Sequence, residues 1–148
     1  MIRPCQNSDI DAVLDIWLDA SIQAHDFVEP GVWESQLESM RDIYLPASEN
    51  HVYDQNPGIA GFYALHGDTL AAIFVAPTLQ GRGIGKQLLA HAKQQRTSLT
   101  LSVYQANDPS YRFYLSQGFR VTSEQADTHT GHPEYTMTWT GAETRPIA

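Results

Sequence analysis

The segment from 70 to 103 constrains the fold of this chain more than any other part of the sequence. An apolar run from Leu70 to Ala76 ends at a proline, a glycine-rich stretch follows at 80–86, and an amphipathic stretch and a second apolar segment come next. A short apolar run bounded by turn residues is typical of a buried strand, and apolar residues spaced three and four apart are typical of a helix. The segment therefore predicts a strand–helix–strand unit whose strands, at 70–75 and 99–103, lie parallel and adjacent.

The hydrophobic pattern also predicts secondary structure along the rest of the chain. The expected elements are, in chain order, a strand at 1–3, helices at about 8–21 and 33–44, strands at 51–54, 59–65 and 69–75, a helix at 83–96, a strand at 98–103, a helix at 108–117, and strands at 120–125 and 134–139. We expect Ser8 and Asp108 to cap the N-termini of two of these helices, and Gly118 to end one of them.

This order of elements predicts an α/β (α+β) fold. The short turns between the strands at 51–75 indicate an antiparallel meander, whereas the strand–helix–strand unit adds a parallel pair. We therefore expect a mixed, mostly antiparallel twisted sheet with a central parallel strand pair and helices on both faces. The length of 148 residues suits a single domain at 1–140, followed by a C-terminal tail at 141–148.

Composition excludes several classes of protein. The single cysteine, Cys5, has no partner for an internal disulfide bond, so a disulfide scaffold is excluded. The longest apolar run is far shorter than the roughly 20 residues of a membrane helix, and the segment Met1–Pro4 does not begin a secretory signal. We therefore expect a cytoplasmic protein, a monomer or homodimer, that has no membrane partner.

The charge is acidic overall and unevenly distributed. The net charge of −8 argues against a nucleic-acid partner, because phosphate neutralisation needs clustered lysine and arginine. The stretch 80–96 carries basic residues and no acidic one, whereas the stretch 19–42 carries six acidic residues against Arg41. The first stretch suits an anion and the second a cation, unless both are only solvated helix faces.

Three glycines at alternate positions mark the turn between the central strand and its helix. In the sequence Gln80-Gly81-Arg82-Gly83-Ile84-Gly85-Lys86, backbone N–H groups can approach an anion closely at the positive end of the helix dipole. The spacing matches neither the Walker A loop nor the dinucleotide-binding fingerprint. The loop is therefore either a cradle for a phosphate group or only a tight strand-to-helix turn.

A second motif follows the next predicted strand and makes the first more specific. The pattern Q-x-x-G-x-G, from Gln80, is followed by N-x(6)-Y-x-x-x-G-F, which begins at Asn107, includes Tyr114 and ends at Phe119. The pair of motifs closely resembles the GNAT superfamily of acyl-CoA N-acyltransferases, of the small bacterial type. The resemblance extends from Ile2 to Trp139 and includes the order of the elements.

The resemblance implies a role for each matching residue. The cofactor-binding residues that it implies are Phe74, Val75, Gln80, Gly81, Arg82, Gly83, Ile84, Gly85, Lys86 and Asn107. The strand end would offer backbone groups to the pantetheine arm and to the developing oxyanion, and the loop would hold the pyrophosphate. Asn107 would bond the pantetheine side, unless it is only a helix cap. Tyr114 would donate a hydrogen bond to the leaving sulfur, unless it is only a core aromatic.

The resemblance also implies an activity, the transfer of an acetyl group from acetyl-CoA to a primary amine by direct attack, with no metal. The acceptor would be a protein lysine, a peptide N-terminus or a small cationic amine. A lysine costs about 4.6 kcal/mol to deprotonate at pH 7, so it needs a base. His25 is the preferred candidate because its loop borders the acceptor site in this family, and Asp26, Glu34 and His66 are the others. The alternative function is a non-catalytic module that binds or senses acyl-CoA.

Overall fold

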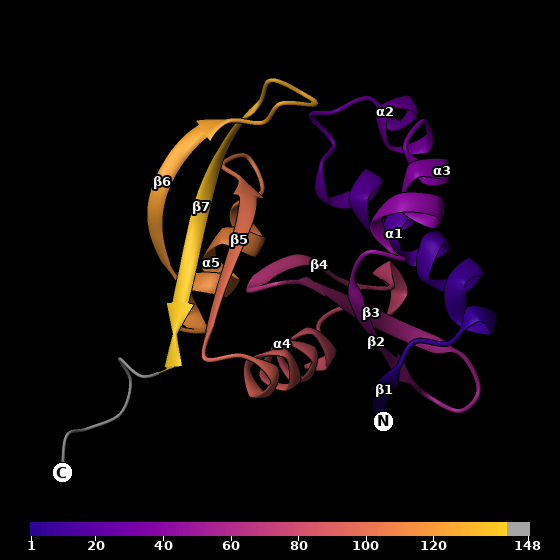
Figure 1. Ribbon diagram of the computed structural model, residues 1–148. Coiled ribbons are helices and arrows are strands. Elements are labelled where there is room, and N and C mark those ends of the chain that lie inside the picture. Colours follow the sequence, from indigo (N-terminus) through magenta and orange to yellow (C-terminus); the bar gives the residue numbers. More distant parts are fainter. Residues whose placement is uncertain (142–148) are drawn as a thin grey trace, which may run out of the picture. The chain divides into compact units, whose positions relative to one another are not determined.

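The computed structural model describes residues 1–141, and the chain divides into two compact units at Ala92 and Lys93 (Figure 1). The first unit comprises β1 (Ile2–Pro4), α1 (Ile10–Ala24), α2 (Pro30–Glu34), α3 (Leu37–Ser39), β2 (Glu49–Asp54), β3 (Ile59–His66), β4 (Thr69–Val75) and most of α4 (Ile84–Gln95). The second comprises β5 (Ser98–Tyr104), α5 (Asp108–Ser116), β6 (Arg120–Ala126) and β7 (Pro133–Thr140). The predicted tail lies, except for Gly141, outside the described residues.

In the first unit, β2 to β4 form the predicted antiparallel meander, and β1 pairs antiparallel with β2. Each strand pairs with the next along the chain, and the register sets Arg3 opposite Val52, His51 opposite Tyr63, and Phe62 opposite Phe74. The bounds of β3 and β4 agree with the sequence prediction to within one residue. The meander is confirmed.

The strand β3 is covered by a helix on each of its faces. Every residue from Ala60 to Leu65 is buried, whereas a strand with one solvated face would alternate between buried and exposed. On one face the Tyr63 hydroxyl lies 2.6 Å from Nδ1 of His91 on α4. The neighbouring residues on the strand point to the opposite face, and α1 contacts β3 there. The expectation of helices on both faces is confirmed for this strand.

The helix predicted at 33–44 is not continuous. It is divided into α2, α3 and a wider helical turn in which the Leu45 N–H donates to the Met40 carbonyl at 2.9 Å. At the first break the Ser35 hydroxyl donates to the Val32 carbonyl at 2.7 Å, an interaction that competes with regular helix bonds. The apolar spacing was read correctly as helical, but it does not reveal where local side-chain bonds interrupt a helix.

In the second unit, β7 lies between β5 and β6 and pairs antiparallel with both. Leu99, Leu101 and Val103 of β5 are buried, and the residues between them are not, so this strand packs one face into a core. The helix α5 contacts β5 and ends before Gly118, whose φ of +90° is the left-handed conformation predicted there.

No helix in the described range 1–141 is both long and apolar enough to span a bilayer.

An ion-pair cluster joins the N-terminal strand to the start of α1. The guanidinium of Arg3 donates to both carboxylate oxygens of Asp9, at 2.7 and 3.0 Å, and to Asp54 at 2.9 Å. Asp9 also accepts the backbone N–H of Gln6 at 2.8 Å, ahead of a 3₁₀ turn at Asn7–Asp9. The prediction that Ser8 caps α1 was wrong, because this additional turn moves the start of α1 to Ile10 and places Asp9 at its N-cap position. At its other end α1 continues to Ala24, beyond the predicted end.

We predict that Asp9→Asn lowers Tm by about 3–8 °C, because Asp9 is buried and its loss leaves Arg3 without its main partner. Asp11→Asn is the matched control, since it breaks an equally short ion pair, with Arg41, between exposed side chains and should change Tm little. Thermal unfolding followed by circular dichroism makes the comparison. Equal Tm values for the two variants would contradict the role of Asp9.

The same cluster predicts a dependence of stability on pH. Hydrogen bonds from Arg3 hold the pKa values of Asp9 and Asp54 below their ordinary values. Groups with depressed pKa values stabilise the fold above the unfolded pKa of about 3.9, and this stabilisation is lost as the pH falls through the folded pKa. We expect the wild type to lose stability more steeply than Asp9→Asn below about pH 4, measured by urea unfolding.

Candidate functional site

The glycine-rich loop presents bare backbone between β4 and α4. Gly81 and Gly83 have φ values of +79° and +80°, which side chains rarely adopt. A Cβ atom added at either glycine would meet no atom of the described residues within 4 Å, so a side chain there would project into open space. The peptide groups between them are therefore accessible to a ligand.

The first turn of α4 adds unpaired donors to this loop. The Gln87 N–H is the first to bond within the helix, to the Gly83 carbonyl at 3.1 Å. The N–H groups of Ile84, Gly85 and Lys86 come before it and have no helical acceptor. The positive end of the helix dipole lies at the same place, so the loop has the geometry and the charge to hold an anion.

The end of β4 is fixed by two contacts that hold the loop in place. The Gln80 side chain donates from Nε2 to the Val75 carbonyl at 3.2 Å, which folds the loop back on the strand. A Cβ atom at Gly61 on β3 would lie 2.6 Å from the Phe74 carbonyl oxygen and 3.0 Å from Leu88 of α4. Gly61 is thus required by close packing, a role that the sequence analysis missed. Its only signal is a glycine inside a strand pattern.

Asn107 is a helix cap. Its side-chain oxygen accepts the N–H of Ser110 at 3.4 Å, at the start of α5, and the residue is buried. The prediction that Asp108 is the cap was therefore wrong. Asp108 is instead the first helical residue and pairs with Arg112 at 2.7 Å. The alternative of a structural Asn107 is confirmed, and its predicted role in cofactor binding stays a prediction.

Tyr114 lies on α5 with its ring half-buried beside Phe113 and Phe119. Its hydroxyl makes no hydrogen bond with any residue in the range 1–141, so its proton is available to a ligand. Burial raises the pKa of Tyr114 well above its ordinary value. The hydroxyl is therefore a hydrogen-bond donor at every physiological pH and a poor source of a fully transferred proton.

His25 ends α1 and is almost fully buried, with 8% of its surface exposed. Its ring lies against Phe27, at 5.8 Å between centroids, and against Trp33, at 5.1 Å. Burial lowers its pKa, so the imidazole is neutral at pH 7, the state that a base requires. Asp26 and Glu34, which follow His25 in the sequence, are both exposed. The His66 side chain contacts the backbone instead, with its Nδ1 at 3.1 Å from the Ala47 carbonyl oxygen.

A polar network that the sequence analysis missed lies at the end of β5. The Tyr104 hydroxyl donates to Asp127 at 2.6 Å, and the Thr130 hydroxyl donates to the same carboxylate oxygen at 2.9 Å. Burial opposes ionisation of Asp127, but these hydrogen bonds hold its pKa below its ordinary value. The network fastens the β6–β7 connection to the turn in which the Asn107 N–H donates to the Tyr104 carbonyl. No periodic pattern in the sequence predicts such hydrogen bonds between residues far apart in the chain.

Within the part of the chain that the structure describes, no three histidine, cysteine, aspartate or glutamate side chains gather as a metal site would require.

Comparisons with known proteins relate the chain to acetyltransferases. A family model described as an acetyltransferase (GNAT) domain matches residues 46–121. The Escherichia coli K12 protein YiaC, which bears the name peptidyl-lysine N-acetyltransferase, is 36% identical over 145 residues, covering 97% of this chain and 99% of YiaC.

Two solved structures show the same fold. Apo-form YjaB from Escherichia coli superposes with a TM-score of 0.82 and 26% identity, over 95% of this chain and 97% of that one. The PaiA N-acetyltransferase from Thermoplasma acidophilum, solved in complex with coenzyme A, superposes with a TM-score of 0.78 and 16% identity, over 95% and 98%. The predicted α/β (α+β) fold class is confirmed.

Loss of the Asn107 cap should destabilise the protein. We predict that Asn107→Ala lowers the free energy of unfolding by about 1 kcal/mol, because the Ser110 N–H loses its acceptor. Asn107→Asp should retain nearly all of the stability, since aspartate caps as well as asparagine. Urea unfolding measures both. An alanine variant as stable as the wild type would show that the side chain does not act as a cap.

Proposed function

The chain belongs to the GNAT family of N-acetyltransferases, and we propose that its acceptor is the side-chain amine of a lysine in a protein. One observation carries this acceptor class, the 36% identity to a peptidyl-lysine N-acetyltransferase over nearly the full length of both chains. The net charge of −8 also suits a cationic acceptor, because opposite charges speed encounter. A cytoplasmic location and a monomeric or dimeric state stay predictions.

The glycine-rich loop would hold the pyrophosphate of acetyl-CoA. The accessible peptides at Gly81 and Gly83, the unpaired N–H groups of the first turn of α4, and the exposed charges of Arg82 and Lys86 support this role. The hydrogen bond from Gln80 to the Val75 carbonyl would hold the loop in a fixed position relative to the end of β4. Backbone groups of Phe74 and Val75 would then receive the pantetheine arm.

The reaction would proceed by direct attack of the amine on the thioester. The lone pair of the neutral lysine Nζ forms a bond to the acetyl carbonyl carbon, the carbon–sulfur bond breaks, and the thiolate of CoA leaves with the electron pair. The amine loses one proton to a base. The products are an N-acetyl-lysine and CoA, and no residue of the chain is acetylated on the way.

Tyr114 would donate a hydrogen bond to the sulfur as negative charge grows on it. Full proton transfer from an ordinary tyrosine to a thiolate is uphill by about 2 kcal/mol, and burial raises the pKa of Tyr114 further. A hydrogen bond that strengthens in the transition state still lowers the barrier without proton transfer.

His25 would receive the amine proton, directly or through water. Burial keeps its imidazole neutral at pH 7, which supports this role. Burial also makes it a weaker base, so it cannot supply the whole of the roughly 4.6 kcal/mol needed to deprotonate a lysine. Desolvation of the bound ammonium group would have to supply the remainder.

The proposed function is tested by incubating the protein with acetyl-CoA and peptides that contain one lysine and a blocked N-terminus. We expect stoichiometric release of CoA and a mass increase confined to the lysine. Acetylation of unblocked peptides at the N-terminus alone would contradict the lysine assignment. CoA binding without turnover on any amine would favour the alternative, a module that binds acyl-CoA without catalysis.

We predict that Gly83→Val abolishes CoA binding, because the new side chain fills the space that the pyrophosphate needs. Gly67→Val is the matched control, since Gly67 also has a positive φ, of +59°, and open space around it, but lies in the β3–β4 turn. Calorimetric titration with CoA compares the variants after circular dichroism has shown that both are folded. CoA affinity retained in Gly83→Val would overturn the assignment of the loop.

We predict that Tyr114→Phe lowers kcat by about tenfold to a hundredfold, with little change in CoA affinity, because a hydrogen bond to a developing charge is lost. Tyr111→Phe removes a hydroxyl from the same helix, from a tyrosine whose ring packs against Tyr135, and is the control. Single-turnover measurements isolate the chemical step from product release. An unchanged single-turnover rate would remove Tyr114 from the mechanism.

A further inference from the structure

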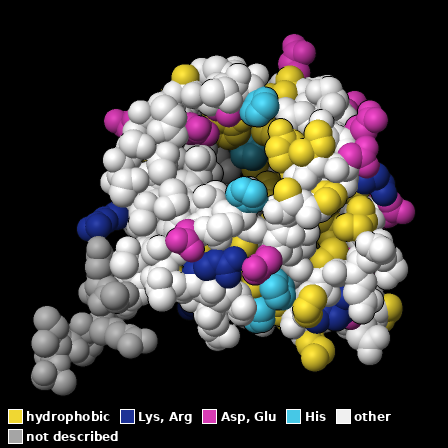
Figure 2. Space-filling model, viewed as in Figure 1, with side chains coloured by type: hydrophobic (Ala, Val, Ile, Leu, Met, Phe, Trp, Pro, Cys, Tyr) yellow, Lys and Arg dark blue, Asp and Glu magenta, His cyan; other side chains and the backbone are white. Residues whose placement is uncertain are grey.

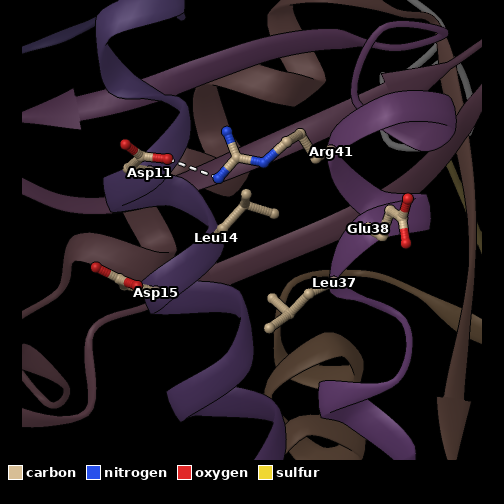
Figure 3. A pocket seen from close by; sticks show the side chains of 6 residues that line it. All are labelled: Asp11, Leu14, Asp15, Leu37, Glu38 and Arg41. Carbon is tan, nitrogen blue, oxygen red and sulfur yellow. Dashed lines mark hydrogen bonds and ion pairs between the residues drawn. The ribbon is translucent and has the colours of Figure 1, made fainter.

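A surface pocket of about 480 Å³ lies in the first unit, between α1 and the segment that contains α3 (Figure 3). It is lined by Asp11, Leu14, Asp15, Leu37, Glu38 and Arg41. None of these residues belongs to the loop, the strand end or the candidate bases described above. The proposed function therefore leaves the pocket without a role.

The lining has an apolar middle and a charged border. Leu14 on α1 and Leu37 on α3 lie in the middle of the pocket, with Leu14 almost fully buried, and Arg41 reaches over Leu14 to Asp11 (Figure 3). Asp15 and Glu38 lie on opposite sides of the leucine pair (Figure 3). An extended chain that crosses the pocket would therefore meet a carboxylate, then two leucines, then a second carboxylate.

The charge of the lining is unbalanced. Arg41 is the one basic residue in it, and its guanidinium pairs with Asp11 at 2.6 Å. Asp15 and Glu38 form no ion pair with any residue in the range 1–141, so two negative charges stay unneutralised. Acidic side chains also gather along the margin of the molecule that α2 and α3 occupy (Figure 2). The surroundings therefore add to the negative potential.

Arg41 shows how a cationic side chain uses this surface. Its aliphatic stem crosses beside Leu14 and its charged end meets a carboxylate (Figure 3). Lysine and arginine side chains commonly cover apolar surface in this way while their charged ends stay in water. A second basic side chain could do the same toward Asp15 or Glu38.

We propose that this pocket docks a segment of the acceptor protein in which an apolar residue is flanked on both sides by lysine or arginine. The apolar residue would lie on the half-buried Leu37, beside the buried Leu14, and the two basic residues would pair with Asp15 and Glu38. The proposal rests on the proposed function, because it assigns the docked segment to a protein that also carries the lysine to be acetylated.

The length of α1 sets the spacing between the docked segment and that lysine. Asp15 and His25 are ten residues apart along the helix, or about 15 Å at 1.5 Å per residue. An extended peptide covers this distance in about five residues. Peptides for the test therefore place the segment about five residues from the single lysine, on either side of it.

The experiment compares peptides that differ only in the docked segment, Arg-Leu-Arg or Ala-Leu-Ala. We expect the wild type to have a KM about fourfold lower for the arginine peptide with unchanged kcat, because two exposed ion pairs each contribute a factor of about two. The advantage should vanish in 1 M salt, where the Debye length is about 3 Å. An Arg-Ser-Arg peptide should bind more weakly than Arg-Leu-Arg, because it leaves Leu37 uncovered.

The double variant Asp15→Asn/Glu38→Gln should lose the preference for arginine. Asp68→Asn/Glu124→Gln removes the same charge from exposed carboxylates outside the pocket and should retain it. Equal KM values for the two peptides in the wild type would overturn the proposal, as would equal behaviour of the two double variants. A dimer of the wild type that dissociates in Asp15→Asn/Glu38→Gln would show that the pocket takes a second copy instead.

A lysine-free Arg-Leu-Arg peptide with a fluorescent label tests docking without turnover. If no lysine peptide is acetylated, the proposed function fails, and the anisotropy of this probe still decides whether the pocket binds such a segment. Binding that is lost in Asp15→Asn/Glu38→Gln but retained in the control supports the pocket. Absence of binding to the wild type overturns it.

Discussion

The support of the glycine-rich loop depends on the close approach of β3 to β4 and α4 at Gly61. With no Cβ at this position, the Phe74 carbonyl comes within 2.6 Å of the place that a side chain would take, and Leu88 packs over the same point. The position of the β4 end therefore depends on the same close packing as the position of α4. The Gln80 side chain, which bonds to the β4 end, is placed with them. A loop that must offer backbone N–H groups to an anion needs such a support, because bare peptide alone has many conformations.

An acidic protein can bind an anionic cofactor because the two kinds of charge act over different distances. Backbone N–H groups and the helix dipole act within the first turn of α4, close to the bound group. The excess of carboxylates acts at longer range on what diffuses toward the protein, and salt screens it. The chain therefore combines a locally positive loop, at 81–86, with a net charge of −8.

Sequence reasoning located the elements well and their ends less well. The strand at 69–75 and the helix after the loop agree with the structure to within about one residue, because alternating and helical apolar patterns extend over the whole element. The caps at Ser8 and Asp108 were predicted wrongly, since a cap depends on one hydrogen bond and its neighbours in sequence are equally suited to make it. The prediction of a continuous helix at 33–44 was also wrong for a local reason, because the Ser35 hydroxyl bonds to the backbone at the first break.

The sequence by itself determined the fold class, the glycine loop and the motif positions of Asn107 and Tyr114, because period and spacing are properties of the linear chain. Only the tertiary structure decided that Gly61 admits no side chain and that Tyr104 bonds to Asp127. These facts depend on distances between segments far apart in sequence, which no local pattern encodes. Burial also belongs to the tertiary structure, and it sets the pKa directions of His25 and Tyr114 on which their chemistry depends.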